Sequence, residues 1–191
     1  MVKADTFERK NHHHRRKFTE GLLNNEVIMT ALNIKAGQTV LDAGCGNGYM
    51  SKIFSDKVSR TGKVYALDPD KYFIEILRNE TKGTNIEAME GDITIQTKLK
   101  RSSIDLIYIS TVIHGFSQRQ MQGFIHETNR LLKTDALLAI VEIEKKETPF
   151  GPPVKLRFSP EELKGIIHLS PVDTIQVGQH FYMQIFRNRE N

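Results

Sequence analysis

Short apolar runs alternate along most of the chain with longer stretches in which apolar residues recur every three or four positions. The short runs are typical of buried strands, and the longer spacing is that of helices with one apolar face. The expected strands, the third with its exit, are Thr39–Asp42, Lys63–Asp68, Ile86–Asp92, Ile104–Ser110 and Ala136–Glu142. The expected helices are Asn24–Leu32, Tyr49–Ser55, Lys71–Asn79 and Met121–Leu132. This alternation predicts an α/β fold, a mostly parallel sheet covered by helices on both faces.

The pattern changes after Glu144. The run Ser159-Pro160-Glu161-Glu162 predicts a helix start, because serine caps a helix, proline fits its first turn and acids there interact favourably with the helix dipole. Two strand-like runs follow, Thr174–Val177 and Phe181–Phe186, and the residues between them fit a tight turn. The sequence therefore predicts an antiparallel hairpin at the edge of the sheet.

The chain has 191 residues, enough for one domain with a substantial core. We expect residues 25–191 to form this domain and residues 1–24 to precede it as a basic arm. The arm concentrates positive charge between Arg9 and Lys17 and contains His12, His13 and His14. Adjacent histidines converge poorly on one metal ion, so the arm is either a solvated extension or a lid over a ligand.

Composition narrows the class of protein. No apolar run approaches the roughly 20 residues that a membrane-spanning helix needs, and the first residues lack the apolar segment of a secretory signal. We therefore expect a cytoplasmic protein without a membrane span. Cys45 is the single cysteine, so the chain cannot form an intrachain disulfide or a thiolate metal cluster, and we expect no metal site. The net charge of +4 is a weak indication of an anionic partner.

A glycine-rich loop, Asp42-Ala43-Gly44-Cys45-Gly46-Asn47-Gly48, follows the first expected strand. Glycines between a strand and a helix let the backbone approach a ligand, because a side chain there would block it. Dinucleotide-binding proteins use the spacing G-x-G-x-x-G, whereas this loop has G-x-G-x-G and carries Tyr49 where the third glycine of that motif would stand. This spacing, together with the lack of a Tyr-x-x-x-Lys pair, argues against a nicotinamide oxidoreductase.

Acidic residues end the first three expected strands. Asp42 lies where it can meet a cationic or amino group. Asp68, followed by Pro69, lies about 20 residues beyond the loop, where a carboxylate accepts hydrogen bonds from both hydroxyls of a ribose. Asp92 and Ile93 follow the third strand and suit an adenine ring, the acid for its amino group and the aliphatic side chain for its face. S-adenosylmethionine (SAM) has a cationic sulfonium, an amino group, a ribose and an adenine ring, and it lacks the pyrophosphate of a dinucleotide.

The order of these segments resembles that of the class I SAM-dependent methyltransferases, and within them the branch that includes the ubiquinone and menaquinone biosynthesis methyltransferases. The resemblance covers roughly residues 27–143 and rests on Val40–Gly48, Ala66–Asp68, Gly91–Ile93 and Ile104–Ile107. It implies a Rossmann-like, doubly wound sheet of seven strands, the last antiparallel, with SAM across the carboxyl ends of the first strands. The expected cofactor-binding residues are Asp42, Gly44, Cys45, Gly46, Asn47, Gly48, Asp68, Pro69, Asp92, Ile93 and Ser110.

The resemblance also implies that the segment from Ser110 to His114 lines the methionine tail and the methyl group of SAM. His114 is the titratable group expected near the sulfonium, where an imidazole could take a proton from a nucleophile. The alternative is that His114 packs at a helix start. SAM is already a strong electrophile, so positioning supplies most of the effect in many methyltransferases, and the sequence does not require a catalytic base.

The methyl acceptor is less well defined by the sequence. The chain lacks the Asn/Asp-Pro-Pro-aromatic motif that follows the fourth strand in enzymes that methylate amides and exocyclic amines, and it lacks a cysteine after the fourth or fifth strand. Positive charge is clustered in the arm and is not interleaved with aromatic residues. We therefore expect a small-molecule substrate and S-adenosylhomocysteine (SAH) as the product. An RNA or protein acceptor, and a non-catalytic SAM-binding partner or sensor, are the alternatives.

Overall fold

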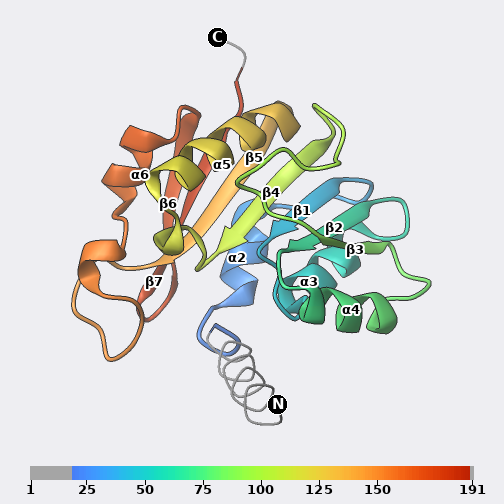
Figure 1. Ribbon diagram of the computed structural model, residues 1–191, viewed down its shortest axis with the longest axis horizontal. Coiled ribbons are helices and arrows are strands. Elements are labelled where there is room, and N and C mark those ends of the chain that lie inside the picture. Colours follow the sequence, from blue (N-terminus) through green and yellow to red (C-terminus); the bar gives the residue numbers. More distant parts are fainter. Residues whose placement is uncertain (1–18, 190–191) are drawn as a thin grey trace, which may run out of the picture.

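The computed structural model describes residues 19–189, so the greater part of the expected basic arm or lid, including its three histidines, lies outside the described residues. A seven-stranded sheet with the order β3-β2-β1-β4-β5-β7-β6 forms the centre of the molecule (Figure 1). Strands β1 to β5 pair in parallel, and β7 pairs antiparallel with both β5 and β6. The predicted α/β sheet with an antiparallel C-terminal hairpin is confirmed.

The strands are β1 (Thr39–Ala43), β2 (Lys63–Asp68), β3 (Ile86–Glu90), β4 (Ile104–Ser110), β5 (Leu132–Ile143), β6 (Ser170–Gly178) and β7 (Phe181–Arg187). The α-helices are α2 (Asn25–Leu32), α3 (Tyr49–Val58), α4 (Lys71–Glu80), α5 (Gln118–Leu131) and α6 (Pro160–Ile166). The described residues also form two short 3-10 helices, η1 (Ile113–Gly115) and η2 (Val154–Leu156).

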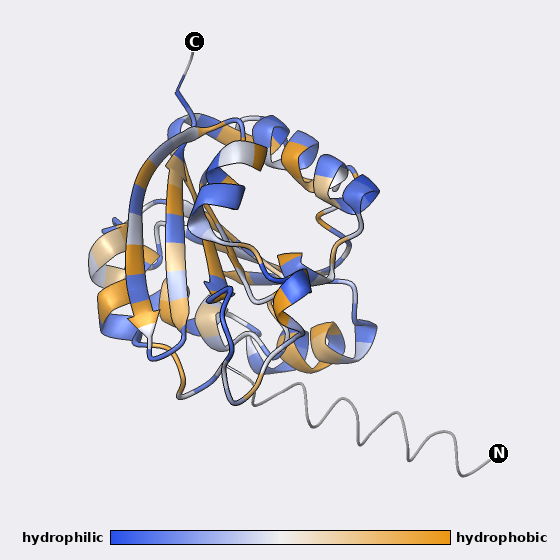
Figure 2. Cartoon of the chain, turned by 90° about the vertical axis from the view of Figure 1, so that its left-hand side faces the viewer, coloured by the Kyte–Doolittle hydropathy of each residue, from blue (hydrophilic) through white to orange (hydrophobic). Residues whose placement is uncertain are grey.

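Helices cover both faces of the sheet. One hydrophobic cluster packs α2, α3 and α4 against the strands, and a second packs α5 and α6 against the opposite face (Figure 1). Hydrophobic and polar residues alternate along the covering helices, as Figure 2 shows, which is the pattern of helices that bury one face. Because both faces are covered, β4 is almost entirely buried. This burial explains its nearly continuous apolar sequence.

Helix α5 begins three residues earlier than the apolar spacing predicts. Its start is fixed by a capping box, in which the Ser117 hydroxyl accepts from the Gln120 amide and the Gln120 side chain accepts from the Ser117 amide. The Ser-x-x-Gln spacing is visible in the sequence and is a known start signal. Polar residues fill this first turn, so a prediction based on apolar residues alone began the helix too late.

The segment just before α2 packs against the C-terminal hairpin. The amide of Asn24 donates to the Val177 carbonyl oxygen at 2.7 Å, and the Asn24 side chain caps α2 by accepting from the Val27 amide. Gly178 ends β6 at a position where a Cβ would lie 2.5 Å from the Leu22 carbonyl oxygen. Among residues 19–189, no helix is long and apolar enough to cross a membrane.

Candidate cofactor and methyl-transfer site

The glycine loop lies at the edge of the sheet where the parallel strands β1, β2, β3 and β4 end. Parallel strands bring their carboxyl ends to one edge, where open α/β sheets bind ligands. Gly44, Gly46 and Gly48 have φ angles of +71°, +52° and +73°. This left-handed backbone favours glycine at each of the three positions, so the alternation of glycines that the sequence shows has a direct conformational cause.

The three glycines serve different purposes. A Cβ at Gly44 would lie 2.6 Å from Val112 Cγ2, and a Cβ at Gly48 would lie 2.4 Å from Leu77 Cδ1. Both positions are therefore filled by neighbouring side chains of the protein. A Cβ at Gly46 would meet nothing within 4 Å. Gly46 is thus the glycine of the loop with open space beside its α-carbon, where a ligand could approach the backbone.

Asp68 at the end of β2 connects this strand to the glycine loop. Its Oδ2 accepts from the Gly46 amide at 2.8 Å, and its Oδ1 accepts from the Asp70 amide at 2.8 Å. The structure therefore brings Asp68 and the loop together, as the sequence analysis expects. Pro69 is exposed beside Asp68.

Asp42 is more deeply buried than its place at the end of a strand suggests. It is 3% exposed and accepts a 2.5 Å hydrogen bond from the Ser51 hydroxyl of α3. Burial raises the pKa of Asp42 to about 7, and the nearby charge of Asp68 acts in the same direction, whereas the Ser51 hydrogen bond lowers it. The carboxyl group of Asp42 therefore has its pKa near neutral pH.

Cys45 is a packing residue within the loop. It is 9% exposed, and burial, followed by the charges of Asp42 and Asp68, raises the pKa of its thiol. Asn47 is also structural, because its Oδ1 accepts from the Tyr49 amide at 3.2 Å. When ionised, Asp42 and Asp68 lie close enough to contribute a negative potential at the Cys45 thiol. Such a potential favours a cationic ligand and disfavours a pyrophosphate.

Asp92 and Ile93 lie in the loop that leaves β3. The Asp92 Oδ1 accepts from the Thr94 amide at 2.8 Å, which fixes the carboxylate in a tight turn. Ile93 is 5% exposed and belongs to the cluster under α5. The structure therefore gives Ile93 a packing role, and its contact with an adenine ring stays a prediction.

The segment after β4 turns sharply at Thr111, whose φ is +55°. A left-handed conformation is rare for a β-branched residue, and such strain is often found at functional sites. The turn directs Val112 onto Gly44 of the glycine loop. Just before it, the Ser110 hydroxyl is buried and lies beside the Tyr108 hydroxyl, with which it interacts. This buried polar group is suited to a ligand at the same edge.

His114 forms a pair with Glu142 that the sequence analysis did not identify. Its Nδ1 lies 2.9 Å from Glu142 Oε2, and the other carboxylate oxygen, Oε1, accepts from the Ile113 amide at 3.1 Å. The Glu142 side chain is fully buried, whereas that of His114 is 22% exposed. An acid within an otherwise apolar strand was the available signal, because a buried carboxylate needs a partner.

A second contact at the site also escaped the sequence analysis. The side-chain amide of Asn25 in α2 donates to the Tyr49 hydroxyl at 2.7 Å. Tyr49 is the first residue of α3, directly after the glycine loop. The oxygen of the same amide, Oδ1, is buried without a partner among the described residues. Helix α2 thus contributes polar groups to this edge of the sheet.

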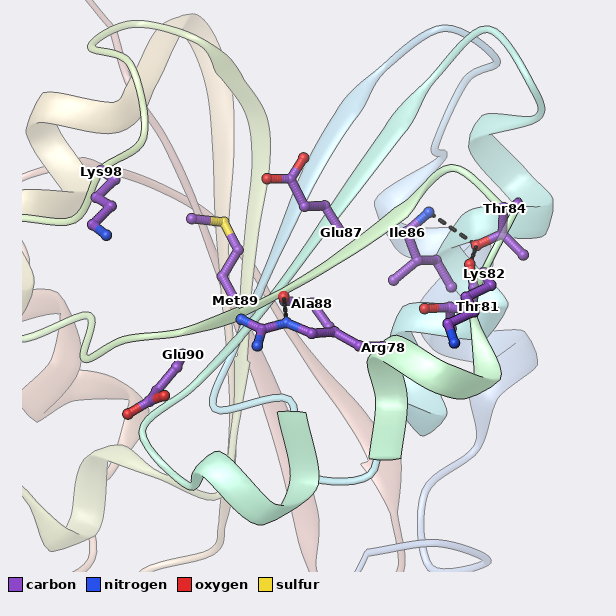
Figure 3. A pocket seen from close by; sticks show the side chains of 11 residues that line it. Arg78, Thr81, Lys82, Thr84, Ile86, Glu87, Ala88, Met89, Glu90 and Lys98 are labelled. Carbon is purple, nitrogen blue, oxygen red and sulfur yellow. Dashed lines mark hydrogen bonds between the residues drawn. The ribbon is translucent and has the colours of Figure 1, made fainter. Parts of the chain in front are cut away.

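A separate groove of about 500 Å³ follows β3 at the outer edge of the sheet (Figure 3). Arg78 Nε donates to the Ala88 carbonyl oxygen at 2.9 Å, and the Ile86 amide donates to Thr84 Oγ1 at 3.2 Å. These bonds occupy backbone groups of the edge strand, which discourages pairing with another chain. No predicted cofactor-binding residue lines the groove.

The described residues fit the cofactor that the sequence analysis expects. Gly46 has open space beside its α-carbon, and the carboxylates of Asp42 and Asp68 lie close enough for their charges to interact. Residues 19–189 contain no group of three or more His, Cys, Asp or Glu side chains that could hold a metal ion.

Known families and sequences include relatives of this chain. Residues 40–135 match the family model described as a methyltransferase domain. Demethylmenaquinone methyltransferase of Staphylococcus saprophyticus is 27% identical over 126 residues, which cover 64% of this chain and 52% of the relative. The probable ribosomal RNA small subunit methyltransferase A of Pyrococcus furiosus is 40% identical over 74 residues, 37% of this chain and 26% of the relative. The chain thus spans about half or less of the length of these relatives.

Solved structures share the whole fold. A SAM-dependent methyltransferase from Aquifex aeolicus superimposes with a TM-score of 0.83 and 24% sequence identity, covering 94% of this chain and 97% of the other. This coverage includes the antiparallel hairpin as well as the parallel strands that end at the glycine loop. The Rossmann-like arrangement expected from the sequence is therefore confirmed.

Proposed function

Because the chain belongs to the methyltransferase domain family, we propose that it transfers the methyl group of SAM to a nucleophile on a small molecule. It is a class I SAM-dependent methyltransferase by family and fold, and SAM is its cofactor. The class of the methyl acceptor, a small molecule, is the part that we propose. When bound, SAM supplies a methyl group on a positively charged sulfur, which is an electrophile without further activation.

The observation that carries the proposal is the contact between the Asp68 carboxylate at the end of β2 and the amide of Gly46 in the open glycine loop, with Asp42 at the end of β1 close by. Burial, followed by the charges of Asp42 and Asp68, raises the pKa of Cys45 inside that loop, while Gly46 has open space beside its α-carbon. A cationic adenosine derivative matches both features. In the proposed arrangement, Asp68 binds the ribose hydroxyls, Asp92 binds the adenine amino group and Asp42 stabilises the cationic end of the ligand.

Two features support a small acceptor over an RNA. The S. saprophyticus relative, named for a demethylmenaquinone, matches 64% of this chain, whereas the ribosomal RNA relative matches 37%. The segment after β4 reads Ser110-Thr111-Val112-Ile113-His114 and lacks the Pro-Pro-aromatic arrangement that the sequence analysis associates with exocyclic amines. The described site offers His114 and its buried partner Glu142 at that position.

Calorimetric titration of the full chain with SAM, SAH and NAD tests the proposed function. SAM and SAH should both bind, and NAD should give no heat of binding, because its pyrophosphate would approach two carboxylates. Labelled SAM should then transfer its methyl group to a low-molecular-weight fraction of cell extract, and nuclease treatment of the extract should not reduce the transfer. Binding of NAD without a response to SAH would contradict the proposal, as would a nuclease-sensitive product.

A further inference from the structure

We propose that Asn25 and Tyr49 together recognise the amino acid end of SAM, its ammonium and carboxylate groups, and so select ligands that carry this end. The inference rests on the proposed function and deepens it, because it adds one residue of α2 and one of α3 to the cofactor site. It begins from the bond that the Asn25 side-chain amide donates to the Tyr49 hydroxyl at 2.7 Å. This bond leaves one acceptor and one donor of the pair unused.

The unused acceptor is the side-chain oxygen of Asn25. This atom, Oδ1, is buried and has no hydrogen-bond partner among residues 19–189. Buried polar side-chain atoms in native proteins are bonded in the large majority of cases, so each exception requires an explanation. An amide oxygen accepts and cannot donate, so its partner must be a donor. An ammonium group is such a donor, and its charge strengthens the bond.

The unused donor is the hydroxyl of Tyr49. The bond from Asn25 uses a lone pair of this hydroxyl, so its own hydrogen is left to donate, and it has no other hydrogen bond to the described part of the chain. The residue is held in place, because its ring packs against the hydrophobic cluster that includes α2 and α3 and its amide donates to Asn47 Oδ1. A fixed O–H donor suits a carboxylate.

Both residues lie at the edge of the sheet that carries the glycine loop. Tyr49 follows Gly48 directly and begins α3. Asn25 begins α2, and the amide of the preceding Asn24 donates to the Val177 carbonyl oxygen near the end of β6. Because β5 and β6 both run antiparallel to β7, β6 ends at the same edge as the parallel strands. The pair therefore stands beside the loop, between the starts of two helices.

One acceptor beside one donor matches a ligand group that carries both kinds of partner. A phosphate group offers acceptors, so it would leave the oxygen of Asn25 unpaired, and an apolar group would leave both atoms unpaired. The ammonium and carboxylate of an amino acid satisfy both. In the proposed site, Asn25 shares the ammonium with Asp42, which is assigned to the cationic end of the ligand, and Tyr49 binds the carboxylate.

Calorimetric titration of the full chain with SAH and with 5′-methylthioadenosine tests the proposal, because the second ligand keeps the adenosine and the thioether but lacks the amino acid end. Tyr49→Phe removes only the hydroxyl, and Asn25→Ala removes the amide at a helical position that suits alanine. Each variant should bind SAH about tenfold or more weakly and 5′-methylthioadenosine within about twofold of wild type. Decarboxylated SAH separates the two roles, because Asn25→Ala should still weaken its binding and Tyr49→Phe should not.

Tyr65→Phe and Asn79→Ala are the matched controls. Tyr65 packs against the cluster on the opposite face of the sheet, and Asn79 is exposed on α4, so both variants should bind all three ligands as the wild type does. SAH affinity equal to wild type in Tyr49→Phe or Asn25→Ala would overturn the proposal. Equal losses for SAH and 5′-methylthioadenosine would also overturn it, because the pair would then support the site without recognising the amino acid end. Failure of the proposed function is distinguishable, because the wild type itself would then not bind SAH.

Discussion

Gly123 of α5 lies directly against the backbone of Thr94, where a Cβ at Gly123 would be 1.9 Å from the Thr94 carbonyl oxygen. Through this contact, the loop after β3 packs against α5. The same loop carries Asp92. The same loop is held further along by Glu127, whose Oε1 accepts from the Thr97 amide at 2.9 Å, and by Arg130, which donates to the Leu99 carbonyl oxygen at 2.8 Å. The position of Asp92 is therefore set by one face of α5.

Replacement of Gly123 by alanine should displace this loop. The added methyl group meets backbone and not a flexible side chain, so we expect a loss of about 1–3 kcal/mol in the free energy of unfolding and weaker SAH binding. Urea unfolding and calorimetry measure the two effects. Gly165→Ala is the matched control, because Gly165 lies in α6 with nothing within 4 Å of a Cβ. Equal stability and affinity for Gly123→Ala and wild type would contradict this role.

Stability should fall with rising pH because of Asp42. Its pKa is about 7 in the folded protein against 3.8 for an ordinary aspartate, so between these values only the unfolded chain has released the proton. Protonated Asp42 therefore favours the folded protein at the acidic end of this pH range. Its contribution to the free energy of unfolding is lost as the pH rises toward 7. The full shift corresponds to about 4 kcal/mol.

Asp42→Asn isolates this effect, because asparagine can still accept from Ser51 but does not titrate. Urea unfolding of both proteins at about pH 5 and about pH 8 measures it. The free energy of unfolding of the wild type, relative to the variant, should decrease between the two pH values. A difference that stays constant with pH would show that Asp42 is already ionised at acidic pH.

Binding of SAM should release a proton from Asp42. A cation near the carboxylate favours its charged form and lowers its pKa, so ligand binding below pH 7 couples to ionisation. Calorimetric titrations in two buffers of different ionisation enthalpy should therefore give different apparent heats at about pH 6, and equal heats for Asp42→Asn. Identical heats for the wild type in both buffers would place the cationic groups of SAM away from Asp42.

Asp68→Asn should weaken SAM binding about tenfold to a hundredfold. Hydrogen bonds from ribose hydroxyls to a charged acceptor are worth about 1.5–3 kcal/mol, and asparagine replaces one acceptor oxygen with a donor. Asp56→Asn, on the exposed side of α3, is the control for the loss of one negative charge. Calorimetry that finds both variants equal to wild type would count against Asp68 as the ribose ligand.

Cys45 should be unreactive in the folded protein. Burial and two nearby aspartates raise the pKa of its thiol, and only the thiolate reacts with an alkylating reagent. Mass spectrometry after iodoacetamide treatment at about pH 8 should show slow labelling in native buffer and fast labelling in urea. SAM should slow the native reaction further, since it would cover the loop. Native and denatured rates that agree would mean that the thiol is accessible.

The regular elements could be predicted closely because their signals are local. The bounds expected for β2 and β4 are those found, since a buried parallel strand consists of consecutive apolar residues. Strand β5 begins at Leu132, before the expected Ala136, because Leu132 pairs with Ile104 of β4 ahead of a register shift, after which Leu137 pairs with Leu106. The apolar pattern does not report such pairing.

By itself, the sequence determined the alternation of strands and helices, the glycine loop and the acids at the strand ends. Each of these depends on residues close together in the chain, so spacing alone revealed them. Only the tertiary structure decided that Glu142 faces His114 and that Gly123 supports the turn of Asp92. These contacts join residues about 28 positions apart, and they exist because the sheet places β4 beside β5 and α5 above both.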